Sequence, residues 1–269
     1  MNLAVILTLA RGVYFAAVML LFGGAVFRTL LKARLKLDAT SPLRWIALVV
    51  ALLSGCLWLV LAAAAMAGAL DRSVLAQTLT GTLFGQVFVL RLAALLGLLL
   101  VPDGWIAAAL AGLALALPAI TGHVAQSSPA GFIAIGATLD AVHLLAAGLW
   151  IGGLAVLLTV RRQLQFAAAL ALFSEWAMVA VLLLVMTGMI NAALVLLGGK
   201  GTDAPLYVYV LCAKLALVLA MLALAVVNRF RLLPGSATGA IARNAVIELA
   251  LGGIVIALAG WLGQLPPTL

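Results

Sequence analysis

The stretch DAVHLLAAGLWIGGLAVLL, from Asp140 to Leu158, consists of apolar residues and glycine except for Asp140 and His143 near its start. As a helix it would extend about 28 Å, close to the roughly 30 Å thickness of the hydrocarbon core of a bilayer. Gly148 and Gly152, four residues apart, would let another helix approach closely. The stretch therefore predicts a membrane-spanning helix that carries an acid and a histidine one turn apart.

The rest of the chain repeats this pattern. Of its 269 residues, 67% are hydrophobic and 8% are charged, whereas about a quarter of the residues of a soluble domain are charged. Short polar segments separate the apolar runs, which makes consecutive helices antiparallel neighbours. We therefore predict an all-α, polytopic integral membrane protein with a single transmembrane domain over residues 1–269. Its antiparallel bundle would have eight transmembrane helices, at residues 3–28, 44–70, 84–101, 105–122, 131–160, 171–198, 206–228 and 241–263.

The basic residues indicate the orientation of this bundle, because connections on the cytoplasmic side carry an excess of Lys and Arg. Alternate connections place ten basic residues on one side and only Arg72 and Lys200 on the other. We expect the basic loops to be cytoplasmic and both termini to lie outside. The net charge of +8 then reflects topology and attraction to anionic lipid, and it does not indicate nucleic acid. The ten residues are Arg28, Lys32, Arg34, Lys36, Arg44, Arg161, Arg162, Arg229, Arg231 and Arg243.

Four charged residues lie in the outer halves of the predicted spans: Arg11, Arg91, Asp140 and Lys214. Each lies about eight residues into a helix that enters from the outside, so together they form a charged layer in the outer half of the membrane. Charges in this position cost several kcal/mol and usually face the interior of the bundle. In one interpretation Asp140 neutralises one cation and the other cations reach the interface. In the other, the layer lines a polar vestibule that is open to the outside.

The two histidines of the chain, His123 and His143, are candidate metal ligands. Asp140 precedes His143 by three residues, so on a helix its carboxylate can hold the imidazole ring and raise its basicity, as such carboxylates do behind metal ligands. A buried structural His–Asp pair is the alternative. The run from 131 to 160 is longer than a membrane requires, and if this helix protrudes outward, His143 approaches His123 at the end of the preceding span. We expect the two histidines to share an outer-side site.

Met186 and Met189, one turn apart in the outer half of the sixth span, would add thioether ligands. Imidazole and thioether together suit copper, and thioether favours Cu(I), although a methionine in a transmembrane helix usually serves packing. Glu175 and Glu248 lie towards the cytoplasmic side, either as exit-side groups or as partners of loop arginines.

Three segments carry a resemblance to a known family. They are DAVHLLAAGLWIGGLAVLL, SEWAMVAVLLLVMTGMINAALVL and LYVYVLCAKLALVLAMLALAVVNRFRLL. Together they resemble the copper resistance protein D (CopD, or PcoD) family, over nearly the whole chain and most specifically over residues 120–233. The resemblance implies a multi-pass protein of the bacterial inner membrane, associated with copper resistance or copper uptake. The residues that match the patterned positions of the family are His123, Asp140, His143, Trp150, Asn191, Lys214, Asn228 and Arg229.

The function expected from these features is an inner-membrane copper transport and copper resistance protein, not an enzyme. It would import copper from the periplasm to the cytoplasm through an outer-side His/Met site, and both of its termini would be periplasmic. Copper would arrive from a periplasmic carrier protein, since the chain has no soluble copper-binding domain. The metal ligands would be His123, His143, Met186 and Met189, supported by Asp140 and Asn191, with Arg11, Arg91 and Lys214 in the charged layer.

Two other classes of function remain open. A b-type membrane cytochrome would bind one haem through His123 and His143 as the two axial ligands. An accessory protein would hold the partners of a copper-resistance system without moving metal itself. The sequence contains no GxxxxGK[ST] motif and no ATPase domain, so a transporter of this sequence would be driven by a gradient, the membrane potential or an intracellular acceptor.

Overall fold

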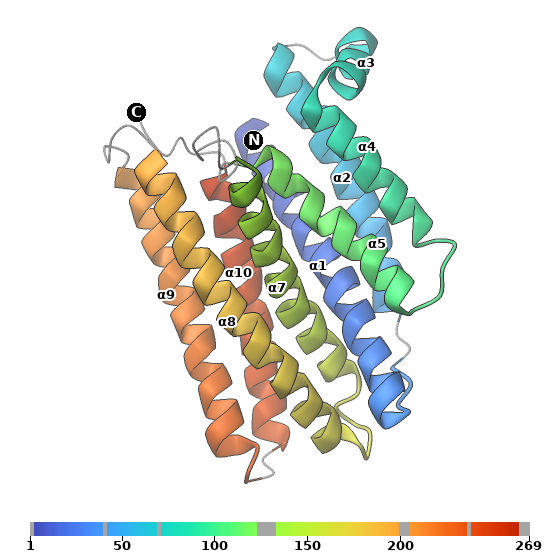
Figure 1. The fold of residues 1–269 in the computed structure, drawn as a ribbon, viewed down its shortest axis with the longest axis vertical. Coiled ribbons are helices and arrows are strands. Elements are labelled where there is room, and N and C mark those ends of the chain that lie inside the picture. The colour runs from blue at the N-terminus through green and yellow to red at the C-terminus, as the bar shows by residue number, and fades with distance from the viewer. Residues whose placement is uncertain are drawn as a thin grey trace.

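The computed structural model describes residues 3–39, 42–68, 71–122, 133–198, 205–235 and 238–263, and within these ranges the protein is all helical. The chain passes through an antiparallel bundle in which most consecutive helices are neighbours (Figure 1). The helices are α1 (Leu3–Leu35), α2 (Leu43–Ala67), α3 (Arg72–Gly81), α4 (Leu83–Gly97), α5 (Trp105–Ala116), the 3₁₀-helix η1 (Leu117–Thr121), α7 (Ile133–Thr159), α8 (Phe166–Gly198), α9 (Pro205–Val227), the π-helix η3 (Asn228–Leu232) and α10 (Thr238–Leu262).

Among the described residues, six helices are long and apolar enough to cross a membrane, and a seventh span results if the bent pair α3–α4 is one span. The prediction of a multi-pass, all-helical membrane protein is therefore confirmed. The predicted spans at 84–101 and 105–122 correspond to shorter helices, because α4 ends at Gly97 and α5 with η1 covers only Trp105–Thr121. The count of eight transmembrane helices remains a prediction.

One predicted connection is itself a helix. The polar segment DRSVLAQTLTG after the second span forms α3, which meets α4 at an angle of 85°. Asp71 starts this helix, because its carboxylate accepts a hydrogen bond from the backbone N–H of Val74 at 2.8 Å. Thr82 then starts α4 in the same way, by accepting from the N–H of Gly85 at 3.0 Å. The local capping residues explain why this segment is helical despite its polarity.

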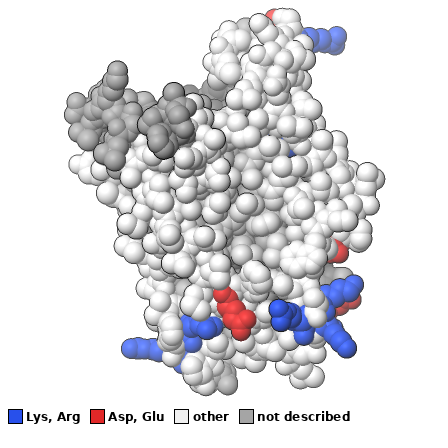
Figure 2. Space-filling model, in the orientation of Figure 1, with Lys and Arg blue, Asp and Glu red and all other residues white. Residues whose placement is uncertain are grey.

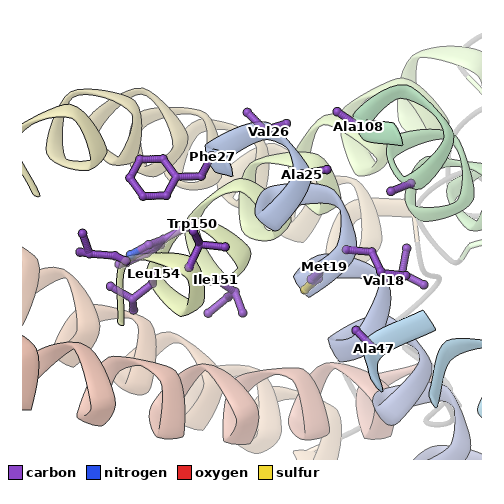
Figure 3. Packing of buried hydrophobic residues seen from close by; sticks show 14 of the residues in the cluster. Val18, Met19, Ala25, Val26, Phe27, Ala47, Ala108, Trp150, Ile151 and Leu154 are labelled. Atoms are coloured by element: carbon purple, nitrogen blue, oxygen red, sulfur yellow. The ribbon is translucent and has the colours of Figure 1, made fainter. Parts of the chain in front are cut away.

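Helix α1 lies at the centre of the bundle and packs against α2, α5, α7 and α10 (Figure 1). Its closest neighbour is α7, and the two backbones meet at glycines. A Cβ atom on Gly23 would overlap the carbonyl oxygen of Gly148, and one on Gly152 would lie 2.5 Å from the carbonyl oxygen of Met19. The predicted close packing at Gly148 and Gly152 is confirmed. Buried apolar side chains of α1 and α7, such as Phe27 and Trp150, fill the surrounding core (Figure 3).

An ionic cluster fixes the turn between α4 and α5 to the ends of α1 and α2. Asp103 accepts two hydrogen bonds from the guanidinium group of Arg28, both at 3.0 Å, and lies 3.6 Å from Nη1 of Arg44. Arg44 also donates to the backbone carbonyls of Leu98 and Val101. These two arginines, which the sequence presents as topology signals, therefore also hold the α4–α5 turn in place.

The basic residues gather at one end of the molecule. Figure 2 shows Lys and Arg concentrated where α1, α7 and α9 end, with a smaller basic patch beside α3. The first residues of α1 and the last residues of α10 lie at the opposite end (Figure 1). The basic connections thus lie at one end of the bundle, as the sequence predicts. The side of the membrane that this end faces stays a prediction.

Candidate functional site

The ring of His143 is held between α7 and α8. Its Nδ1 atom lies 3.0 Å from the hydroxyl oxygen of Thr187, and the ring packs against Gly188, where a Cβ atom would lie 3.3 Å from Cε1. The Thr187 hydroxyl donates its own proton to the backbone carbonyl of Leu183 at 2.5 Å. With that proton on the carbonyl of Leu183, the hydroxyl oxygen is left as an acceptor, and on this ground we assign the proton of the neutral His143 ring to Nδ1.

A second link between the same helices lies one turn away. Asn191 donates from Nδ2 to a carboxylate oxygen of Asp140 at 3.5 Å, and the other carboxylate oxygen lies against Gly122, 3.1 Å from where a Cβ atom would be. Asp140 and His143 thus share one face of α7, and each is joined to a residue of the facing side of α8. The hydrogen bond that orients His143 comes from Thr187, while Asp140 binds Asn191.

Asp140 is also the negative charge around which two intramembrane cations gather. Its carboxylate interacts electrostatically with Arg11 of α1 and with Lys214 of α9, and Lys214 in turn interacts with His143. Arg11 is fixed further by a hydrogen bond of 3.2 Å from Nη1 to the carbonyl oxygen of Gly263. Three helices therefore supply charged groups to one polar region inside the bundle.

Arg91, the fourth member of the predicted layer, lies beside this region, because it acts electrostatically on Arg11 and both guanidinium groups lie over the ring of Trp58. It is 1% exposed and lies in a cage of aromatic rings, with its Cζ atom 4.2 Å from the ring centroid of Tyr14 and 4.3 Å from that of Trp58. Its Nε donates to the Tyr14 hydroxyl at 3.0 Å, and that hydroxyl donates to the carbonyl of Ala114 at 3.1 Å. This arginine is stabilised by cation–π contacts and a hydroxyl group, and it links α4 to α1 and α5.

Two atoms in the polar region lack a hydrogen-bond partner among the described residues: Nε of Arg11 and Oδ1 of Asn191. Asn191 is 8% exposed, so its free acceptor faces the interior beside Asp140. Buried polar atoms are nearly always paired, and an orphan of this kind marks a place where water, an ion or another group binds. The region around Asp140, His143 and Asn191 therefore has unused capacity for a ligand.

The structure does not bring every predicted ligand to this region. Met186 and Met189 are 54% and 70% exposed on α8, whereas Thr187 of the same helix is buried. His123 lies outside the described residues, directly after Gly122. Within the described residues, no group of three or more His, Cys, Asp and Glu side chains is arranged to hold a metal ion.

Sequence reasoning missed three residues that the structure makes important. Thr187 and Tyr14 are the partners that hold His143 and Arg91, and Asn244 belongs to a polar network around Glu248. Each is a polar residue in an apolar helix, which is a signal visible in the sequence, but the partner of each is on another helix.

The fold and the site define a polytopic membrane protein with charged groups and a histidine inside its bundle, and such groups mark a candidate functional site. Comparison with known families narrows the class. Residues 1–133 match the family model described as "Copper resistance protein D-like, N-terminal domain", and residues 167–262 match the model described as "Copper resistance protein D". The chain belongs to the copper resistance protein D family.

The stretch that carries Asp140 and His143 lies between the two matched ranges. No curated protein and no solved structure matches the chain.

Proposed function

We propose that the protein carries copper across the bacterial inner membrane, from the periplasm to the cytoplasm, and that His143 is a ligand on its path. The observation that carries the proposal is the hydrogen bond between His143 and Thr187. It uses Nδ1 as a donor, so the lone pair of the neutral ring is on Nε2, the nitrogen with which an imidazole can bind a metal ion. A fixed ring orientation of this kind is what supports metal ligands in proteins.

The second ligand in this proposal is His123. Gly122, the residue before it, lies against the carboxylate of Asp140, which is one turn from His143 on α7. Two imidazoles supply nitrogen ligands that copper accepts in either oxidation state, and the unpaired Oδ1 of Asn191 offers an acceptor for a water molecule beside them. The proposal thus puts copper capture beside Asp140 and His143 of α7, close to Gly122 and the facing side of α8.

Asp140 lowers the positive charge that a copper ion would meet in the polar region. Arg11 and Lys214 would repel a copper ion, and Asp140 offsets part of their charge because it interacts with both. Arg91 remains a further positive charge that acts on Arg11, and its guanidinium group is stabilised by cation–π contacts with the rings of Tyr14, Trp58 and Phe88.

Met186 and Met189 remain predicted ligands for a later step. Both are exposed, and at 100° per residue Met186 lies about 100° and Met189 about 160° around α8 from Thr187, so neither faces His143 in this arrangement. A periplasmic carrier protein is the proposed donor of copper, and the copper gradient, the membrane potential or a cytoplasmic acceptor is the proposed driving force.

Uptake of copper into proteoliposomes tests the proposal. Vesicles with the wild-type protein should accumulate copper faster than protein-free vesicles, and His143→Ala should remove the difference while the variant remains folded. A folded His143→Ala protein that transports copper at the wild-type rate would contradict the role of His143. A visible spectrum of the same preparation decides about haem, because two axial imidazoles would give the absorption bands of a b-type cytochrome.

A further inference from the structure

A cavity of about 220 Å³ lies between α7, α8, α9 and α10, in the half of the bundle that carries the basic loops. Helix α8 packs mainly on α7 and α9 packs mainly on α10, so the side chains between α8 and α9 leave this space open. Most of the wall is apolar, and Trp150 and Leu154 contribute to it from the same side of α7 (Figure 3). Among the described residues that line the cavity, the ionisable side chains are those of Glu248 and Arg229.

Glu248 is 2% exposed and stands at the centre of a hydrogen-bonded network. Its Oε1 accepts from Nδ2 of Asn228 at 2.7 Å, and the indole N–H of Trp150 is a second donor to the carboxyl group. Asn244 donates to Oδ1 of Asn228, also at 2.7 Å, and so fixes the amide that holds the acid. Side chains from α7, η3 and α10 thus orient one carboxyl group at the cavity wall.

The carboxyl group has no ion-pair partner among the described residues. Of the elements around it, α7 offers Trp150 and α10 offers Asn244, and the one cation on the cavity wall, Arg229, donates to the hydroxyl of Ser174 on α8 at 2.6 Å. A negative charge in such a place is costly, since the group is buried and no described cation forms an ion pair with it, and uptake of one proton removes the cost. The neutral donors around the group can hold either form, because a protonated carboxyl still accepts hydrogen bonds.

The position of Glu248 relates it to the candidate copper site. Trp150, which donates to Glu248, lies seven residues after His143 on the same stripe of α7. Two turns of helix separate the two levels by roughly 10 Å along the axis. A cation that leaves the level of His143 towards the basic end would therefore pass the level of this carboxyl group and the cavity beside it.

We propose that Glu248 is a proton-binding site that exchanges its proton through the cavity. The step is a simple protonation, in which the carboxylate gains one proton and no other bond changes. Its role in transport rests on the proposed function: the ionised form accompanies a copper ion in the inner half of the membrane, and the protonated form is restored once the ion has left.

Infrared difference spectroscopy of the reconstituted full-length protein, recorded in the absence of copper between acidic and alkaline buffer, tests proton binding directly. The wild type should show the carbonyl band of a buried protonated carboxyl group, and Glu248→Gln should lose it. Glu175→Gln is the matched control, since Glu175 of α8 is an acid that does not line the cavity. This variant should keep the band. Absence of the band in the wild type, or its survival in Glu248→Gln, would overturn the proposal.

A second variant keeps the proposal testable if Glu248→Gln fails to fold. Trp150→Phe removes the indole donor and leaves the acid in place, so the band should shift in frequency, and an unshifted band would overturn the assignment. Copper uptake separates this proposal from the proposed function: Glu248→Gln should lose the stimulation of uptake by a proton gradient. If the wild-type protein does not transport copper but shows the carboxyl band, and Glu248→Gln loses that band, the proposed transport function is wrong and the proton-binding site is supported.

Discussion

Nδ1 of His143 on α7 lies 3.0 Å from the hydroxyl oxygen of Thr187 on α8, and that hydroxyl is itself bonded to the carbonyl of Leu183. Replacement of Thr187 by Val removes the acceptor while keeping the shape of the side chain. If the ring needs this orientation to bind copper, Thr187→Val should weaken copper affinity by about tenfold to a hundredfold, the usual effect of losing the group behind a metal ligand. Titration of the purified protein with copper in competition with a chelator measures the effect.

Thr138→Val is the matched control for this variant. Like Thr187, Thr138 donates to a carbonyl of its own helix, that of Ala134 at 2.7 Å. It lies on α7 and is exposed, and no hydrogen bond joins it to His143. Its replacement should leave copper affinity unchanged.

Asp140→Asn should weaken copper affinity less than Thr187→Val does, because the hydrogen bond of Asp140 is with Asn191. An equal loss in Thr138→Val and Thr187→Val would show that the hydroxyl of Thr187 has no specific role.

The packing of α1 on α7 should be sensitive to a single methyl group. Gly23→Ala places a Cβ atom onto the backbone of Gly148, and overpacking of this kind typically costs about 1–3 kcal/mol. The same change at Gly12 of α1 meets no atom within 4 Å and should leave stability unchanged or raise it slightly. Thermal unfolding in detergent would compare the two variants, and equal unfolding temperatures would refute the close contact.

The cage around Arg91 predicts a stability effect without loss of any charge. Tyr14→Phe deprives Nε of Arg91 and the carbonyl of Ala114 of their common partner, and unpaired buried groups of this type cost about 1–3 kcal/mol. Tyr209→Phe serves as the control, since Tyr209 is 72% exposed. We expect a lower unfolding temperature for Tyr14→Phe only. A Tyr14→Phe protein as stable as the wild type would mean that the rings alone hold the arginine.

Thiol labelling in intact cells tests the predicted orientation. In a background of Cys56→Ala and Cys212→Ala, a cysteine introduced at Ser127 should react with a membrane-impermeant reagent, because the segment TGHVAQSSPAG is predicted to lie in the periplasm. A cysteine introduced at Gln163, in the basic connection between α7 and α8, should react only after the inner membrane is permeabilised. The reverse pattern would place the His143 end of the bundle on the cytoplasmic side.

Long apolar runs made most of the fold predictable, because the thickness of a bilayer sets the length of a spanning helix. The predicted runs at 44–70, 206–228 and 241–263 agree with α2, α9 and α10 to within a few residues. The predicted runs for α1 and α8 were too short at the basic end, because α1 continues past residue 28 to Leu35 through sequence that includes Lys32 and Arg34, and α8 already begins at Phe166. Helix α3 was missed because its composition is polar and its start depends on a single capping residue.

The candidate site was predictable as a set of residues but not as a set of contacts. Asp140 and His143 share a face of α7, which helical spacing requires. The partner of each depends on how α8 is rotated against α7, and this rotation follows from packing at positions such as Gly188, which contacts the His143 ring. The same rotation directs Thr187 inward and leaves Met186 and Met189 exposed.

Copper bound to the purified protein is the most direct test of the account. Metal analysis of the full-length protein, equilibrated with Cu(I) and then separated from free metal, should find copper bound to the wild type and none bound to a folded His143→Ala variant. The wild type should show no haem absorption in the same sample. Equal copper contents in the two proteins, or a wild type that binds no copper, would contradict the claim that His143 is a copper ligand.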